Sequence, residues 1–257
     1  MTGLSLAHKF TFLVLFMLML LLAFTAFLAC GGSSGGSSGP IGPVDPGDIL
    51  GNGNVVEESR SVSGFSSVNL SGEGTLIIEQ TGSESLRVRA DDNLLQYIQT
   101  AVVGSELEIR TEPGVDIQPT QGIEYLLTVD DMTNVGLLGV GRIECDGLTT
   151  DRLSLVFSGV GSVLFTELDA RQLDVNMSGV GDVQFSGTVT EQEVRVSGVG
   201  DYNGRGLSSN RATVVLNGSS SATVRVSDRL TVRVDGSGCV SYIGNPIITG
   251  TGCTQKL

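Results

Sequence analysis

The 257-residue chain contains no tryptophan and a single histidine, His8, within its first ten residues. The rest of the chain therefore cannot form a Ser-His-Asp or Cys-His catalytic centre, a histidine general base or a histidine zinc site. Basic residues are also scarce, since 15 Lys and Arg stand against 28 Asp and Glu, a formal net charge of −13. This balance argues against nucleic acid as a partner, because binding it needs a basic surface. We predict no catalytic residues, no metal site and no cofactor.

Glycine, in contrast, is abundant, with 36 residues. Hydrophobic residues make up 40% of the chain and charged residues 17%, which is typical of a folded protein and not of a disordered one. The length allows one large domain or two small ones.

Residues 1–29 have the pattern of a secretory signal peptide, in which Lys9 precedes a long apolar run. The sequence Phe27-Leu28-Ala29-Cys30 resembles the bacterial lipobox, which implies cleavage before Cys30 and attachment of a diacylglycerol to its thiol. Gly31 follows in place of the Asp that signals inner-membrane retention. The resemblance therefore implies an exported protein that is lipid-anchored in the cell envelope, at the outer membrane. The alternative is an uncleaved anchor, since about 20 apolar residues can span a bilayer.

Residues 30–50 are expected to comprise the lipidated cysteine and a flexible tether. The segment after Cys30 is rich in Gly and Ser, and Pro40, Pro43 and Pro46 stiffen its distal part. We expect the tether to have an end-to-end distance on the order of 25 Å. It would hold a folded head, residues 51–257, near a membrane.

A glycine motif repeats through the head. Gly139-Val140-Gly141 is followed by Ser-Gly-Val-Gly at 158–161, 178–181 and 197–200, and degenerate copies follow at 217 and 235. The first glycines of successive copies are separated by 18 to 20 residues. We expect the repeated glycines to lie at sharp turns with positive φ. The turn glycines are Gly159, Gly161, Gly179, Gly181, Gly198, Gly200, Gly236 and Gly238.

Apolar and polar residues alternate on both sides of each motif, which predicts strands with one buried face. The expected inward residues before the motifs are Leu153, Leu155, Phe157, Leu173, Val175, Met177, Val194, Val196, Ala212, Val214, Leu216, Leu230, Val232 and Val234. Those after the motifs are Ile143, Val163, Phe165, Val183, Phe185 and Tyr202. Each repeat is thus predicted to be a strand, a glycine turn, a second strand and a looser turn.

The regular period predicts an all-β fold, a right-handed parallel β-helix (solenoid) with about 20 residues per coil. A single coil buries too few side chains to be stable alone, so the coils must stack. Residues 54–137 keep the period only loosely, which indicates an irregular N-terminal half or a second subdomain. The main alternative is a β-sandwich-like stack of antiparallel sheets.

Residues 55–254 resemble the head-GIN domain family. The resemblance is carried by ESRSVSGFSSVNLSGEGTLIIEQ, LRVRADDNLLQYIQTAVVGSELEI, the SGVGD repeats and YIGNPIITGTG. This family is described as an autotransporter adhesin head and is found in bacterial secreted proteins and lipoproteins. The resemblance implies a β-helical fold and no established enzymatic activity, and it supplies no catalytic residues.

Asp182 and Asp201 follow the glycine motif on adjacent repeats. Stacked about 5 Å apart, they could serve a retaining glycosidase or hold Ca²⁺. The simpler interpretation is a solvated turn position, because Arg142 and Ser162 occupy the same place in other repeats and no acidic ladder continues.

Three cysteines follow Cys30. Cys239 and Cys253 each follow a Gly-X-Gly motif, so stacked motifs would place them at disulfide distance, and an exported location permits oxidation. Two free thiols are the alternative. Cys145 is expected to be a small buried or half-buried residue.

These features favour a non-enzymatic cell-envelope lipoprotein that presents a β-helical surface for adhesion or binding. Its expected partners are the membrane, through the lipid, and a glycan or an envelope protein. The alternatives are a polysaccharide-active β-helix enzyme and a structural envelope spacer. The scarcity of aromatic residues in the head argues against the enzyme, since such enzymes use aromatic platforms.

Overall fold

The computed structural model describes residues 48–257, which form strands and one short 3₁₀ helix, η1 (Leu95–Tyr97). The expected signal peptide, Cys30 and most of the tether lie outside these residues. None of the helical structure within 48–257 is long and apolar enough to cross a membrane.

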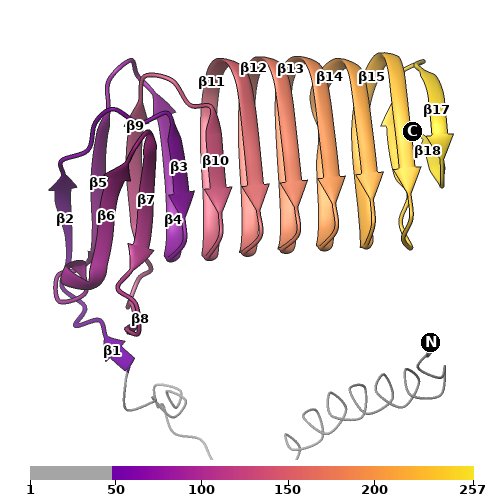
Figure 1. Cartoon of the computed structure of the whole chain (residues 1–257). Helices are drawn as coiled ribbons and strands as arrows, with labels where there is room; N and C mark the ends of the chain where they lie inside the picture. The colour runs from indigo at the N-terminus through magenta and orange to yellow at the C-terminus, as the bar shows by residue number, and fades with distance from the viewer. Residues whose placement is uncertain (1–47) are drawn as a thin grey trace, which may run out of the picture. The chain divides into compact units, whose positions relative to one another are not determined.

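The strands fall into three groups along the chain (Figure 1). The N-terminal group consists of β1 (Asp48–Leu50), β2 (Val55–Arg60), β3 (Ser67–Leu70), β4 (Glu73–Gln80), β5 (Ser85–Asp91), β6 (Ile98–Val103), β7 (Glu106–Thr111), β8 (Asp116–Gln118), β9 (Glu124–Val129) and β10 (Asn134–Leu137). The long central strands are β11 (Val140–Phe157), β12 (Val160–Met177), β13 (Val180–Val196), β14 (Val199–Leu216) and β15 (Ser219–Val234). The last coil contains β16 (Val240–Ile243), β17 (Ile247–Thr251) and β18 (Thr254–Lys256).

Each central strand is one coil of a right-handed parallel β-solenoid with a period of about 20 residues, as predicted. The coils stack in parallel register, so that Val140 pairs with Val160 and Val160 with Val180. The prediction of a looser turn at the far end of each repeat, opposite the glycine corner, is wrong in one respect. The chain bends there but stays in the strand ladder, because most residues around the bend, such as Leu148 with Leu168, still pair between coils. We call the part of each coil after the glycine corner the first leg and the part before the next corner the second leg.

The two legs build two sheets that enclose the core. One sheet runs from β2 through β5, β9, β4 and the first legs to β16 and β18. The other runs from β6 through β7, β3, β10 and the second legs to β17. The solenoid therefore has two lateral faces, a glycine-corner edge and an opposite edge where the coils bend.

The N-terminal region is only partly solenoidal. Strands β3 and β4 form a coil in parallel register with β10 and β11, so the stack continues into this region as expected. Beyond it, β2, β5 and β6 pair antiparallel with their neighbours. Antiparallel pairing thus occurs, but it is confined to the end of the solenoid.

The predicted inward residues form the core. All are buried except Val234, which is half-buried in the last complete coil. Phe165 and Phe185 stack between adjacent coils with ring centroids 5.0 Å apart, and Tyr202 lies 6.3 Å beyond Phe185. Stacking of like residues thus fills the interior along its axis.

The glycine corners combine two constraints. Gly161, Gly181 and Gly200 have φ between +140° and +144°, as expected for a sharp turn. Gly159, Gly179, Gly198, Gly236 and Gly238 do not have positive φ, so that part of the prediction is wrong for them. A Cβ on Gly159 would instead overlap the carbonyl oxygen of Gly139 in the preceding coil. Glycine is required there because the coils approach closely.

The first residues that the structure describes, Asp48–Leu50, lie in the expected tether and form strand β1. Strand β1 pairs in parallel with β8, and a polar network ties the following residues to the end of β5. The buried Asp91 carboxylate accepts hydrogen bonds from the Gly53 N–H at 2.7 Å and from the Thr120 N–H at 2.9 Å and hydroxyl at 2.8 Å. Burial raises the pKa of Asp91, but these hydrogen bonds outweigh it and hold the pKa below its ordinary value.

Candidate binding cleft

A polar cleft of about 350 Å³ lies on the lateral face formed by the first legs of β13, β14 and β15. It is lined by Asp182, Val183, Gln184, Asp201, Tyr202, Asn203, Arg205, Ser221 and Thr223. Most of these side chains point outward from the strands, whereas Val183 and Tyr202 are buried and form its floor. We call this feature the polar cleft.

A bulge in β14 shapes the polar cleft. Gln184 pairs with Asn203, but Ser186 pairs with Gly206, so β14 contains one extra residue opposite β13. The extra length displaces Arg205 from the ladder and leaves its side chain exposed. Bulges re-aim side chains in this way and often occur next to functional sites.

The two carboxylates singled out in the sequence meet at one end of the polar cleft. Asp182 accepts a hydrogen bond from the backbone N–H of Asp201 at 3.1 Å, and Asp201 accepts one from the N–H of Ser221 at 3.2 Å. Each carboxylate therefore links its own coil to the next. Within residues 48–257, no three His, Cys, Asp or Glu side chains form a group able to hold a metal ion.

Neutral hydrogen-bonding groups occupy the middle of the polar cleft. The Asn203 amide donates to the Gln184 carbonyl at 3.5 Å, and its own carbonyl accepts from the Arg205 N–H at 3.2 Å. Thr223 is the next residue in this column of the sheet. Amides and hydroxyls both donate and accept, so this column can recognise a ligand rich in hydroxyl groups.

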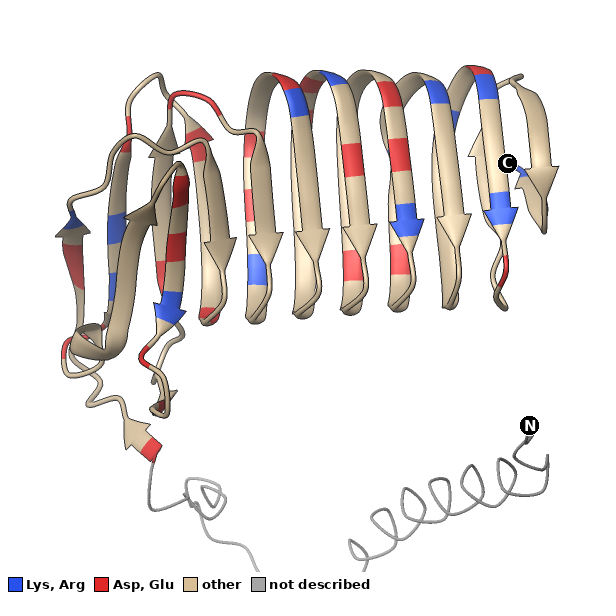
Figure 2. Ribbon diagram, viewed as in Figure 1, with Lys and Arg blue, Asp and Glu red and all other residues tan. Residues whose placement is uncertain are grey.

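Charge is unevenly distributed along the solenoid (Figure 2). Residues 48–198 contain 24 acidic and eight basic side chains, whereas residues 199–257 contain three acidic and six basic ones. The polar cleft lies at the boundary between these regions, with Arg205 at its side and Arg225 donating to the carbonyl of Arg205 at 3.0 Å. It is therefore less repulsive to an anionic ligand than the N-terminal region.

Aromatic side chains do not contribute an exposed platform in the described part of the chain. All four Phe in residues 48–257 are buried, and the four Tyr are buried or half-buried. Burial raises the pKa of Tyr202 well above its ordinary value. The observed pattern is consistent with the expectation that the aromatic residues serve the core.

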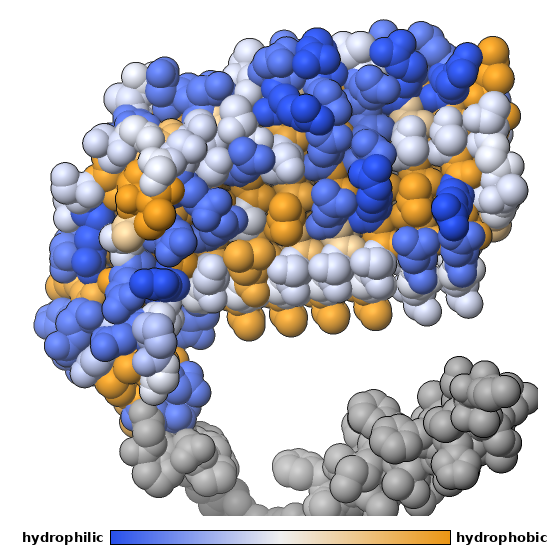
Figure 3. Space-filling view, viewed as in Figure 1, coloured by the Kyte–Doolittle hydropathy of each residue, from blue (hydrophilic) through white to orange (hydrophobic). Residues whose placement is uncertain are grey.

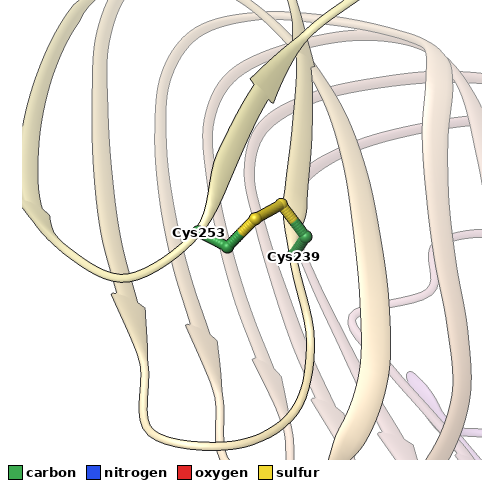
Figure 4. The surroundings of a disulfide bond; sticks show 2 residues. All are labelled: Cys239 and Cys253. Carbon is green, nitrogen blue, oxygen red and sulfur yellow. A yellow bond between two sulfur atoms is a disulfide. The ribbon is translucent and has the colours of Figure 1, made fainter.

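The cysteines do not line the polar cleft. Cys239 and Cys253 are joined in a disulfide in the last coil, with their Cα atoms 4.7 Å apart (Figure 4). Cys145 is buried in β11, and burial, with a smaller effect of Asp146, raises the pKa of its thiol to about 12. Its thiol is therefore protonated and unreactive at neutral pH.

The eight predicted turn glycines all lie at the glycine-corner edge, where an added Cβ would overlap backbone of the preceding coil. A buried polar chain, which was not predicted from the sequence, lies behind the polar cleft. The Tyr202 hydroxyl donates to the Gln192 side-chain carbonyl at 2.9 Å, and the Gln192 amide donates to the Ser209 hydroxyl at 2.8 Å. The only signal was Gln192 itself, a polar residue in the column of Leu173 and Ala212.

Fold and cleft together define a β-solenoid with a polar cleft on one lateral face. The chain belongs to the family described as "Putative auto-transporter adhesin, head GIN domain", which matches residues 64–246. Membership of this family is consistent with a role of the chain in adhesion or binding, and with an exported protein of the cell envelope. A search of curated proteins finds no match.

Solved structures share the fold. A "putative adhesin" from Bacteroides fragilis is 25% identical with a TM-score of 0.78, covering 81% of this chain and 100% of its own. A "putative lipid binding protein" from Parabacteroides distasonis is 21% identical with a TM-score of 0.68, covering 82% and 99%. A "putative adhesin" from the same species is 18% identical with a TM-score of 0.60, covering 82% and 100%. At 21% and 18% identity, the two Parabacteroides structures show only that this chain shares their fold.

Proposed function

We propose that the protein is a non-enzymatic adhesion head, lipid-anchored in the outer membrane, that binds glycan chains in its polar cleft. The observation that carries this proposal is the column of Gln184, Asn203 and Thr223 across three stacked coils. Adjacent coils lie about 4.8 Å apart, so an extended saccharide along the axis meets a hydrogen-bonding group on each coil. Membership of an adhesin family supports the same function.

Binding without turnover fits the arrangement of the acidic groups. Asp182 and Asp201 are both used to hold backbone N–H groups of the next coil. Residues 48–257 contain no histidine that could act as a general base. These features favour recognition over hydrolysis.

The proposal is tested with the chain from residue 30 to 257 on a glycan array. We expect the wild-type chain to bind a restricted set of glycans, and the Gln184→Ala, Asn203→Ala variant to lose about tenfold or more in affinity, since two hydrogen-bonding groups are removed. Asn176→Ala removes an exposed amide from a second leg and serves as the matched control. Absence of glycan binding, or equal binding by the double variant, would refute the proposal.

The same samples distinguish binding from catalysis. We expect mass spectrometry of bound glycans to show no shortened products. Products that disappear in the Asp182→Asn, Asp201→Asn variant would instead establish a polysaccharide-active enzyme.

Lipid anchoring has a separate test. We expect the wild-type chain to be cleaved before Cys30 and recovered with the outer membrane, and Cys30→Ala to remain unprocessed. Normal processing and membrane recovery of Cys30→Ala would exclude lipidation at this residue.

A further inference from the structure

Four valines form an exposed apolar row on the glycine-corner edge. Val140, Val160, Val180 and Val199 are 50–60% exposed and occupy one column of the parallel register. Figure 3 shows a row of hydrophobic side chains along the lower edge of the coils. We call these four residues the valine ridge. Its repetition on four successive coils distinguishes it from the isolated apolar residues found on most protein surfaces.

The corners that carry the valine ridge contain no charged side chain. Residues 138–141, 158–161, 178–181 and 197–200 consist of Gly, Val, Ser and one Leu. Within these four coils the nearest charged residues, Arg142, Asp182 and Asp201, lie two positions after the valines on the first legs. The bends at the opposite edge instead carry Asp151, Glu167, Asp169 and Arg171. On these four coils the glycine-corner edge is therefore uncharged, whereas Glu73 and Asp235 place one acidic residue at the corners on either side of them.

The chain enters the fold at this same edge. Strand β2 runs antiparallel to β5, β5 runs antiparallel to β9, and β9 is parallel to β4 and thus to the first legs. Strand β2 and the first legs therefore run in the same direction, and both start at the glycine-corner edge. Figure 1 shows β1 beyond the start of β2 on that side.

Seventeen residues separate Cys30 from Asp48. Such a segment spans at most about 60 Å when fully extended. A lipid on Cys30 would thus confine the glycine-corner edge to the neighbourhood of the bilayer, at an effective concentration on the order of millimolar. At this effective concentration, even a weak apolar contact between the glycine-corner edge and the bilayer is formed for much of the time.

A second copy of this chain fits the valine ridge less well than a lipid surface does. A stable dimer buries roughly 1,000 Å² or more, and four half-exposed valines on a narrow edge offer much less. A lipid surface requires no shape complementarity and accepts small apolar side chains at the level of the headgroups.

We propose that the valine ridge rests on the surface of the bilayer to which the chain is anchored, and so orients the solenoid parallel to the membrane. This inference rests on the proposed lipidation of Cys30. It leaves the lateral faces, and with them the polar cleft, accessible beside the membrane.

The test supplies the anchor chemically, so it does not depend on lipidation in cells. The chain 30–257 is coupled through Cys30 to a maleimide phospholipid in phosphatidylcholine vesicles. Cys30 is the thiol expected to react, since Cys145 is buried and Cys239 and Cys253 are joined in a disulfide. A diazirine-bearing phospholipid then labels residues in contact with lipid, and peptide mass spectrometry locates the label.

We expect labelling at the glycine corners to exceed labelling at the opposite bends by about tenfold, and replacement of all four valines by threonine to abolish this preference. Threonine keeps the shape and the strand preference of valine. Val156→Thr, at an exposed position on a second leg, is the control and is expected to leave the preference unchanged. Circular dichroism verifies that each variant is folded.

Equal labelling of both edges, or labelling that survives the four substitutions, would overturn the proposal. A dimer that forms without vesicles and is lost in the threonine variant would also overturn it, by assigning the ridge to a second copy. Failure of lipidation at Cys30 would appear in the processing experiment and would not alter the vesicle result.

Discussion

At the scale of single residues, the glycine corners separate two reasons for requiring glycine. Gly159 has no positive φ, but a Cβ there would overlap the Gly139 carbonyl oxygen. Gly147, at the opposite bend, has a φ of +75° and open space around its Cα. Substitution of Gly159 therefore tests the effect of crowding between coils, and substitution of Gly147 tests the effect of backbone conformation.

We expect Gly159→Ala to lower the free energy of unfolding by about 3 kcal/mol or more, because the backbone of two coils must separate. Gly147→Ala is expected to cost only about 1 kcal/mol, the cost of a left-handed conformation for a residue with a Cβ. Urea unfolding monitored by circular dichroism measures both. Equal effects would show that close approach of the coils does not make glycine necessary at position 159.

Asp91 is expected to make the stability of the N-terminal region depend on acid pH. Its pKa in the folded chain lies below the ordinary value of 3.8, so its ionised form stabilises the fold above that pH. This contribution is lost as the pH falls below about 4 and through the folded pKa. Asp91→Asn should be less stable than wild type at pH 7, and the difference should shrink toward pH 2. Unfolding midpoints across this range provide the measurement, and a constant difference would contradict the prediction.

At the scale of elements, the buried chain from Tyr202 to Gln192 and Ser209 couples the two legs across the core. Tyr202→Phe leaves the buried Gln192 carbonyl unpaired, and Gln192→Leu leaves the Tyr202 hydroxyl unpaired. Each change is expected to cost about 1–3 kcal/mol. The double variant should recover much of this loss, since an apolar residue restores the column of Leu173 and Ala212. A double-mutant cycle by urea unfolding measures the coupling, and strict additivity would refute it.

The disulfide is expected to stabilise the last coil locally. Cys239 and Cys253 close a loop with a sequence separation of 14, for which chain entropy predicts about 3 kcal/mol. Cys253→Ser should therefore speed hydrogen exchange in β16, β17 and β18 and leave β11–β13 unchanged. Cys145→Ser changes a cysteine outside the last coil and provides the comparison. Unaltered exchange in the last coil of Cys253→Ser would contradict this role.

The sequence was sufficient to predict the central strands and their inward residues, because period-two alternation and a 20-residue repeat are both local patterns. Leu155, Val175 and Val194 could be assigned to one buried column without coordinates. The direction of pairing could not be predicted for β5, since Leu86, Val88 and Ala90 alternate in the same way in parallel and antiparallel sheets. The bends were also misjudged, because Gly147 and Gly187 adopt positive φ there but so does Glu167, and no single residue type marks the bend.

The candidate site was less predictable than the fold. Stacking of Asp182 and Asp201 followed from the repeat. The polar cleft itself depends on the bulge at Arg205, which changes the register of one coil against its neighbours. A bulge is visible in sequence only as one extra residue in a period that already varies between 18 and 20.

At the scale of the whole molecule, each central coil pairs only with the coils on either side, so the number of coils should be adjustable. Deletion of residues 160–179 removes one period and joins Gly159 to Val180, which restores a Ser-Gly-Val-Gly corner. We expect this chain to fold, with the same circular dichroism spectrum per residue and a lower unfolding midpoint. Deletion of 160–169, half a period, should prevent folding because it reverses the stacking of the two legs. Folding of both deletions, or of neither, would contradict a modular stack.

The alignment of the backbone hydrogen bonds along the solenoid axis has a mechanical consequence. When a pull along this axis acts between the coil of β11 and the coil of β14, the bonds of both sheets at each coil interface are loaded at once and share the force. A pull on the C-terminal residue instead peels β18 from β16, one bond after another, and then acts through the disulfide on Cys239. The stack of central coils is therefore expected to resist tension along its axis far better than tension applied to the C-terminal residue.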